Sequence, residues 1–70
     1  MNNRKEIKNK YNLIIGWIDE REGGISTATH IKKGYVGRYV KSSNLTLDKS
    51  GRIYCYGDGL SDLIREADRS

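Results

Sequence analysis

The apolar residues of this 70-residue chain lie in short runs that alternate with polar, glycine-containing segments. In the first run, Leu13, Ile15 and Trp17 alternate with Ile14 and Ile18, so the first three are expected on one face of a strand and the other two on the opposite face. A strand with apolar side chains on both faces is typical of the interior of a sheet. The pattern therefore predicts a central strand here.

The segments that follow predict an antiparallel meander, because each is short, rich in β-branched or aromatic residues and bounded by turn residues. Residues 20–24 end in two glycines, which supply the positive φ angles of a tight hairpin. Beyond this turn, the predicted strands cover residues 25–31, 35–41, 45–47 and 52–56.

The strand over residues 35–41 alternates valine and tyrosine. Val36 and Val40 are expected on one face, and Tyr35 and Tyr39 on the other. Gly37, in the middle of this strand, indicates a β-bulge or the close approach of another backbone.

A short phrase recurs three times along the chain. Residues 12–18 read NLIIGWI, residues 33–39 read KGYVGRY and residues 50–56 read SGRIYCY, with starts 21 and then 17 residues apart. This spacing suits a unit of strand, turn, return strand and turn, which again favours a β-meander.

The C-terminal segment changes to a helical pattern. Asp58 is a candidate N-cap, and Leu60, Leu63, Ile64 and Ala67 follow at the i, i+3, i+4, i+7 spacing of one buried helix face. The predicted fold is therefore α+β, a four- to five-stranded antiparallel β-meander followed by one C-terminal α-helix. Residues 11–70 are expected to form a single domain.

The remaining segment, residues 1–10, is polar and basic, and it is expected to be a flexible arm or a single helical turn. It lacks the apolar stretch of a signal peptide, and no apolar run in the chain approaches the roughly 20 residues of a membrane span. We therefore expect a cytoplasmic protein with no membrane partner.

The length of the chain limits its stability. A domain this short buries only about 60% of the surface that its unfolded chain exposes. The single Cys55 excludes an internal disulfide and a cysteine-based zinc cluster, so association with further copies is the remaining source of stability. A homo-oligomer, dimeric or larger, is expected.

The net charge of +4 is unevenly distributed along the sequence. Residues 1–10 carry +3 and residues 32–41 carry +4, whereas residues 11–31 and 58–70 each carry −2. Such a distribution favours oriented contact with a charged partner over indiscriminate binding of polyanions.

No set of residues requires a particular reaction. His30 lacks an adjacent catalytic partner in the sequence, and it is expected as a polar residue on the outer face of a strand. Cys55 lies between two tyrosines of a predicted strand, which indicates a small core residue. The glycines form no phosphate-binding motif, and the acidic residues 19–22 are better explained as solvated turn charges than as a calcium loop. The chain is therefore predicted to be no enzyme and to hold no metal or cofactor.

A basic and aromatic surface is the remaining candidate site. Tyrosines that stack bases within a cationic groove bind single-stranded nucleic acid, but tyrosines are also common in strands and at protein interfaces. The candidate residues for contact with a partner or with nucleic acid are Lys32, Lys33, Tyr35, Arg38, Tyr39, Lys41, Arg52, Tyr54 and Tyr56.

Two segments carry a family resemblance. The phrases KSGRIYCYGDGLSDLI at 49–64 and KGYVGRY at 33–39 resemble small bacterial β-meander proteins of the four-fold β-flower type, although Tyr54 stands where that pattern has glycine. The resemblance implies a sheet scaffold and no assigned activity. The order of strands followed by one helix is also similar to the dimeric, transcriptional-coactivator type of single-strand-DNA-binding fold.

In size and general type the chain further resembles the short inhibitors encoded by phages and other mobile elements, including anti-CRISPR proteins. The leading hypothesis is a non-enzymatic protein-binding module, of this inhibitor type, that acts on a larger nucleic-acid-handling complex. The alternative is a dimeric sheet protein that binds single-stranded nucleic acid directly.

Overall fold

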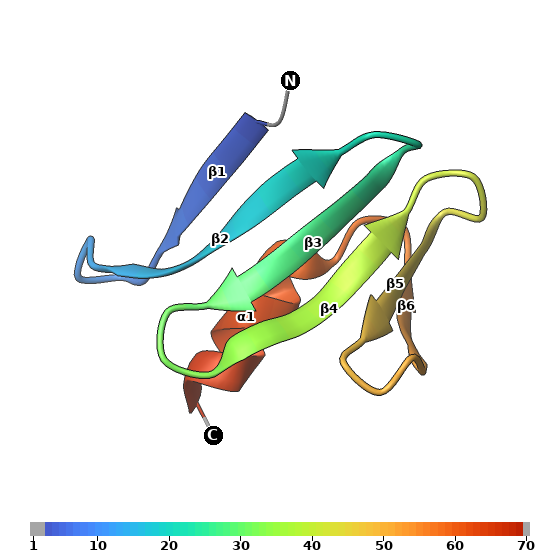
Figure 1. Ribbon diagram of the computed structural model, residues 1–70. Helices are drawn as coiled ribbons and strands as arrows, with labels where there is room; N and C mark the ends of the chain where they lie inside the picture. Colours follow the sequence, from blue (N-terminus) through green and yellow to red (C-terminus); the bar gives the residue numbers. More distant parts are fainter. Residues whose placement is uncertain (1–2, 70) are drawn as a thin grey trace.

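The computed structural model describes residues 3–69, which form one six-stranded sheet and one helix (Figure 1). Each strand pairs antiparallel with the next along the chain, so the spatial order of the strands is their order in sequence. The elements are β1 (Asn3–Lys8), β2 (Ile14–Arg21), β3 (Ile25–His30), β4 (Gly34–Val40), β5 (Leu45–Asp48), β6 (Ile53–Tyr56) and α1 (Leu60–Arg69).

The predicted α+β meander with one C-terminal helix is confirmed, but the sheet has six strands, whereas four or five were expected. The additional strand is β1, within the segment predicted to be a flexible arm; Met1 and Asn2 of that segment lie outside the described residues. The backbone of β1 pairs with β2 from Asn3 opposite Glu20 to Lys8 opposite Ile14. The pattern of β1 is weak because only Ile7 of this strand is buried. The strand conformation of β1 therefore depends on its pairing with β2.

Helix α1 packs on one face of the sheet against β2, β3 and β4 (Figure 1). Its predicted stripe is confirmed, since Leu60, Leu63 and Ile64 are buried and Ala67 packs against the core. The Asp58 carboxylate accepts the backbone N–H of Leu60 at 3.2 Å, as an N-terminal cap should. Within residues 3–69, the opposite face of the sheet carries no second layer, and we call it the open face.

Three β-bulges shift the alternation of side chains within the strands. The extra residues are Ile15 in β2, Val36 in β4 and Tyr54 in β6, each lying where the register of the neighbouring pair shifts by one residue. A bulge places two residues opposite one, so residues before and after it no longer follow a single period of two.

The bulges correct the faces predicted for two strands. In β4, Val36 belongs to the core and Tyr39 packs against it, whereas Tyr35 and Val40 lie in register with residues of the open face. The prediction that the two tyrosines share a face was wrong because it assumed uninterrupted alternation.

In β2, the residues predicted to share a face with Trp17 separate from it. Ile15 and Ile18 belong to or pack against the core, while Ile14 and Trp17 lie on the open face. Leu13 precedes the strand and is exposed.

Glycines beside two of the bulges allow the helix to approach the sheet. A Cβ atom on Gly16 would lie 2.8 Å from Ile64 Cγ2, and one on Gly37 would collide with Leu63 and with the Leu47 carbonyl. Both features predicted for Gly37, a bulge and a close approach, are therefore present.

Three of the five hairpins, β1–β2, β3–β4 and β5–β6, repeat one arrangement. In each, the residue at the end of the first strand or directly after it accepts backbone N–H bonds from the following loop through its side chain. Asn9 accepts from residues 11 and 13, and Asp48 accepts from residues 50 and 52. His30 does the same for Lys32 and Lys33 through Nδ1. The sequence repeat thus reflects three equivalent hairpins, with the bulge of the third displaced by one residue.

Candidate functional site

The open face is built from side chains that register places in rows across the sheet. One row runs through all six strands and contains Arg4, Asp19, Thr27, Arg38, Leu47 and Ile53. The row beside it is apolar over four strands and contains Ile25, Val40, Leu45 and Tyr56. Apolar side chains therefore gather on the half of the open face formed by β4, β5 and β6.

Several of these apolar side chains are water-exposed. Tyr56 is 81% exposed, Ile53 56% and Tyr35 43%. A contiguous apolar patch on one side of a small sheet is the kind of surface that binds a partner. The open face is therefore a candidate interface.

The β1–β2 side of the open face is more polar. Arg4 Nε lies 2.8 Å from Asp19 Oδ1, and its guanidinium lies 5.0 Å from the centre of the Trp17 ring. The hydrogen bond to Asp19 raises the pKa of Arg4 above its ordinary value. The two charges compensate one another, so this side presents little net charge.

Arg38 lies in the middle of the same face, and its surroundings differ from those of Arg4. It is half-buried, and the register places Thr27 on one side of it and Leu47 on the other. Within residues 3–69, no carboxylate lies within ion-pair distance of its guanidinium. Arg38 thus lies between a threonine and a leucine, next to the apolar row of Ile25, Val40, Leu45 and Tyr56, and its donors remain available to a partner.

A second surface forms at one end of the sheet. In an antiparallel meander, the first, third and fifth connections lie at the same end. These connections are residues 9–13, 31–33 and 49–52, and we call them together the basic end, because every charged side chain in them is basic. The basic side chains are Lys10, Lys32, Lys33, Lys49 and Arg52.

The acidic side chains near the basic end are engaged in internal hydrogen bonds. Asp68 Oδ1 lies 2.9 Å from His30 Nε2, and Glu66 accepts the Tyr54 hydroxyl at 2.7 Å. Asp48 accepts backbone N–H groups of its own loop, and the bond from Arg52 is the main reason that its pKa lies below the ordinary value. These carboxylates stabilise the fold, whereas Lys10, Lys32, Lys49 and Arg52 of the loops are exposed.

The opposite end of the sheet has a different charge. Its connections are residues 22–24, 41–44 and 57–59, which contain Glu22 and Asp58 against the single cation Lys41. The molecule measures 34 × 27 × 17 Å, so the two ends lie farther apart than the Debye length of about 10 Å at 0.1 M salt. A ligand at one end therefore responds mainly to the charge of that end.

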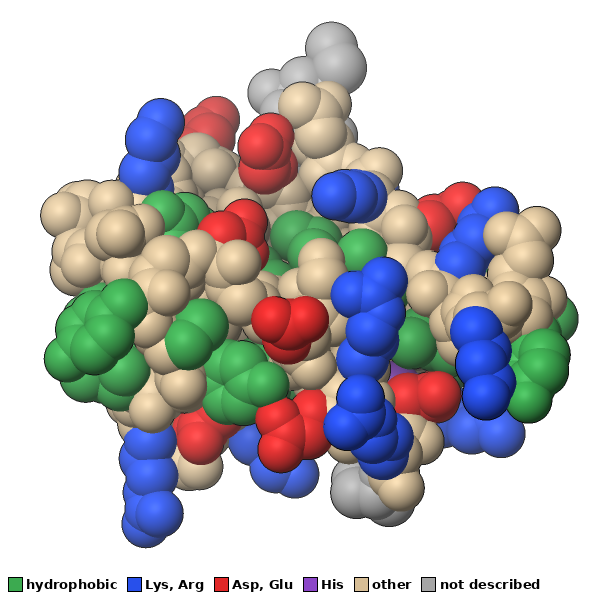
Figure 2. Space-filling model, turned by 180° about the vertical axis from the view of Figure 1, so that it is seen from behind, with side chains coloured by type: hydrophobic (Ala, Val, Ile, Leu, Met, Phe, Trp, Pro, Cys, Tyr) green, Lys and Arg blue, Asp and Glu red, His purple; other side chains and the backbone are tan. Residues whose placement is uncertain are grey.

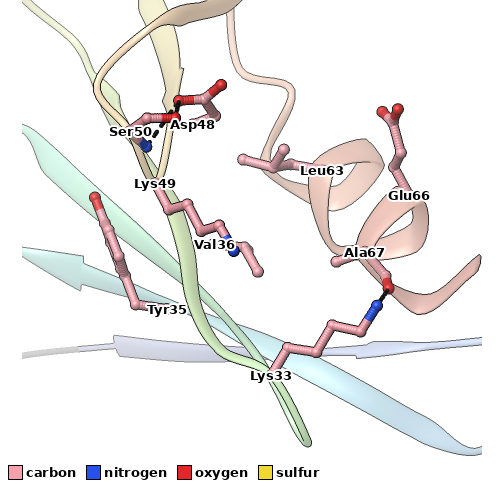
Figure 3. Close-up of a pocket in the computed structure, with 9 residues that line it drawn as sticks. All are labelled: Lys33, Tyr35, Val36, Asp48, Lys49, Ser50, Leu63, Glu66 and Ala67. Atoms are coloured by element: carbon pink, nitrogen blue, oxygen red, sulfur yellow. Dashed lines mark hydrogen bonds between the residues drawn. The ribbon is translucent and has the colours of Figure 1, made fainter. Parts of the chain in front are cut away.

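A cavity of about 370 Å³ lies between the second and third loops of the basic end, beside α1 (Figure 3). Lys33 and Lys49 reach into this region from the two loops, Tyr35 comes from β4, and Leu63 and Glu66 come from the helix. The Lys33 ammonium group donates to the carbonyl of Ala67 in the last turn of α1. The cavity exists because β4 continues past the end of its pairing with β5.

The helix side has no uniform charge, and hydrophobic side chains gather at one edge of it, at the left of the view (Figure 2). Seen from behind, acidic and basic side chains are interspersed over this side, and the histidine is almost hidden between them (Figure 2). This view agrees with the 3% exposure of His30. The charge of the molecule therefore differs between its two ends, whereas the helix side carries a mixture of both signs.

The structure separates the residues predicted as one binding surface. Tyr35, Arg38 and Tyr56 lie on the open face, whereas Tyr39 and Tyr54 pack against the core beside the helix. Lys32, Lys33 and Arg52 belong to the basic end, and Lys41 lies at the opposite end. The four tyrosines thus do not form one stacking platform.

Tyr54 has a structural role, unlike a tyrosine that is exposed for contact with a ligand. Its hydroxyl donates to Glu66, and this bond, together with burial, raises the pKa of Tyr54 to about 12. A hydroxyl held in this way joins β6 to α1.

His30 was predicted on an outer face, and this prediction was wrong. The side chain is buried because α1 covers β3, and the following loop folds back over the ring so that two of its N–H groups reach Nδ1. Nδ1 accepts two backbone N–H groups, so Nε2 carries the proton that is donated to Asp68. Both ring nitrogens are occupied, which makes the residue structural.

Cys55 faces the same side as Thr46 and lies against Gly59, where an added Cβ would collide with its sulfur. Cys55 was predicted as a small core residue, but it is only partly buried and is not part of the core cluster. Within the described residues, no three His, Cys, Asp or Glu side chains come together in a way that holds a metal ion. No helix among them is long and apolar enough to cross a membrane.

Several residues of the two surfaces were not among the predicted site residues, among them Leu45, Leu47 and Ile53 on the open face. Lys10 and Lys49 belong to the basic end, and Trp17 lies on the open face. The lysines were detectable in principle, since alternate loops of a meander share one end. Trp17 required knowledge of the bulge that separates it from Ile15.

Comparison with known proteins adds no assignment, because no family model, curated protein or solved structure matches this chain.

Proposed function

We propose that this protein is a non-enzymatic binding module that docks onto a larger protein through its open face. The observation that carries the proposal is Arg38, a half-buried cation without a carboxylate partner among residues 3–69, which lies beside Leu47 and next to the apolar row of Ile25, Val40, Leu45 and Tyr56. Arginines in apolar surroundings are frequent energetic centres of protein interfaces, because a partner carboxylate can be paired bidentately while water is excluded.

The partner surface is defined by this chemistry. It carries apolar side chains that cover Leu45, Leu47 and Ile53, and a carboxylate placed to meet Arg38. The resemblance in size and type to short phage-encoded inhibitors, including anti-CRISPR proteins, favours a component of a nucleic-acid-handling complex as that partner.

The test is a comparison of two charge reversals of equal size. Arg38→Glu changes a residue of the open face, whereas Arg65→Glu changes an exposed residue of α1. Each substitution lowers the net charge by the same amount. Proteins captured from the source cells by the unmodified chain should be lost with Arg38→Glu and retained with Arg65→Glu. Capture by both variants alike would overturn the proposal.

A photo-crosslinking amino acid at position 47 identifies what covers the open face. A crosslink from position 47, absent when the same group is at position 65, supports docking through this face. A crosslinked product containing two copies of this chain and no other protein would show that the open face serves self-association instead.

A further inference from the structure

We infer that the basic end is a second binding site, independent of the open face, and that its ligand is the phosphate backbone of a nucleic acid. The inference begins with the topology. Three hairpin loops far apart in sequence, 9–13, 31–33 and 49–52, lie together at one end, and none contains an acidic residue.

The cations of these loops are available to a ligand. Lys10, Lys32, Lys49 and Arg52 are exposed, and within residues 3–69 their side-chain nitrogens make no hydrogen bond or ion pair. Lys10 lies 5.3 Å from the ring centre of exposed Tyr11, which leaves a flat aromatic surface beside a cation. Cations with an adjacent aromatic ring are the usual elements of contact with nucleic-acid backbones and unstacked bases.

The spacing of the loops fits an extended polyanion. Neighbouring strands lie about 4.8 Å apart, so loops two strands apart are about 10 Å apart and the three loops span about 20 Å. One strand of a duplex advances about 3.4 Å per nucleotide, so this span corresponds to about six phosphates. The loops therefore form a line along one backbone rather than a pocket for one phosphate group.

The observations favour a nucleic acid over an anionic membrane. Membrane surfaces bind proteins that combine basic residues with a continuous apolar face. Large apolar side chains are exposed in the first two loops, at Tyr11, Leu13 and Ile31. Residues 49–52 of the third loop are KSGR, and the exposed Ile53 that follows them belongs to the open face. The basic end thus has a continuous line of charge without a continuous apolar surface.

The experiment measures fluorescence anisotropy of a labelled single-stranded DNA of about 12 nucleotides, a length within the usual site sizes, at about 50 mM and about 200 mM salt. With the four available cations engaged and a slope near −0.7 per phosphate, affinity should fall about 50-fold between these salt concentrations. A labelled duplex of the same length tests whether the backbone is read in both forms.

Two double variants with the same net charge locate the site. Lys10→Glu with Lys49→Glu alters the basic end, whereas Lys5→Glu with Lys41→Glu alters side chains that line cavities with Glu20 and Asp58 toward the other end. The first pair should weaken binding at least about tenfold at low salt and make the salt slope shallower by about 1.4, because two contacts are lost. The second pair should weaken it less than about threefold.

Circular dichroism reports whether a charge reversal disturbs folding. In that case, glutamine in place of glutamate at the same two pairs of lysines keeps the comparison valid. Equal loss of affinity in both pairs would overturn the inference, because binding would then follow total charge. Absence of binding at low salt would also overturn the inference. So would tighter binding of the chain to phosphatidylserine vesicles than to either oligonucleotide. Arg38→Glu leaves the three loops unchanged, so failure of this inference and failure of the proposed function are distinguishable.

Discussion

His30 in β3 and Asp68 in the last turn of α1 face each other across the interface of sheet and helix, with Nε2 2.9 Å from Oδ1. On the other side of the ring, Nδ1 accepts the backbone N–H groups of Lys32 and Lys33. One side chain therefore joins the second loop of the basic end to the C-terminus of the helix. This contact connects the stability of the fold to the shape of a candidate binding surface.

Replacing His30 by alanine should lower the free energy of unfolding by about 1–3 kcal/mol, because the part-buried hydrogen bonds to Lys32, Lys33 and Asp68 are lost together. His30→Asn should cost less, since an asparagine already caps the equivalent first loop at Asn9. Urea unfolding followed by the fluorescence of the single tryptophan measures both. Equal costs for the two variants would show that loop capping is not the role of this side chain.

The contact between Gly37 and Leu63 predicts a non-additive pair of substitutions. Gly37→Ala should destabilise by about 1–3 kcal/mol, because the new methyl group collides with Leu63 and with the backbone of β5. In a Leu63→Val background, which lacks the colliding Cδ2 atom, the same change should cost at least about 0.5 kcal/mol less.

Gly34→Ala is the control for this pair. Nothing lies within 4 Å of the position of its Cβ, but its φ is +80°, so its cost of about 1–2 kcal/mol comes from the backbone alone. That cost should be the same in both backgrounds. If Gly37→Ala also costs the same in both, the helix does not approach the sheet at this point.

Leu63→Ala should itself lower the free energy of unfolding by about 2–5 kcal/mol, as for other buried leucines. In a domain of this size, such a loss can abolish folding. Thermal unfolding by circular dichroism is sufficient to measure it. An unchanged melting temperature would contradict the packing of α1 on β4.

The hydrogen bond from Tyr54 to Glu66 predicts a loss of stability at high pH. In the unfolded chain Tyr54 ionises near its ordinary pKa of 10, whereas in the folded protein its pKa is about 12. Between these values the unfolded state loses the proton first, so the free energy of unfolding should fall as pH rises from about 10 to about 12. The stabilisation is fully present below pH 10.

Ultraviolet titration of tyrosinate should show one of the five tyrosines ionising late, and Tyr54→Phe should remove that component. The same variant should also show a smaller decrease in stability over this pH range. A late component that persists in Tyr54→Phe would assign the raised pKa to another tyrosine.

Self-association remains an expectation of the short chain, and the open face provides a way to measure it. Trp17 lies on this face between Glu6 and Thr29 in register. If two copies pair through their open faces, dilution from about 50 μM to below 1 μM, a range that covers micromolar dissociation constants, should shift Trp17 emission to longer wavelength. Light scattering coupled to gel filtration should then show a dimer or larger assembly, and Leu47→Asp should give a monomer. A monomeric unmodified chain at the highest concentration would contradict this expectation.

Local sequence signals identified most of the elements of the fold. The turn glycines, the β-branched runs and the Asp58 cap act over a few residues, so the strands from β2 onward and the helix stripe of Leu60, Leu63 and Ile64 could be predicted. The first strand could not, because its polar residues fold only by pairing with β2. Its stability is supplied by a partner strand rather than by its own apolar residues.

The faces of the strands required the tertiary structure. One inserted residue at Ile15, Val36 or Tyr54 changes which side chains face the helix, and a bulge leaves no strict mark in the sequence. For this reason Tyr35 and Tyr39 were expected on one surface and lie on two. His30 likewise becomes buried only because α1 covers β3.

The sequence by itself determined the fold class, the turns, the capped helix and the excess of positive charge, since each follows from residue type and spacing over short distances. Only the tertiary structure decided which of those charges act together. The meander brings loops 9–13, 31–33 and 49–52 to one end, and the helix covers one face of the sheet while leaving Arg38 on the other. Surfaces arise from residues that are distant in sequence, and their composition depends on topology and register, which local patterns do not contain.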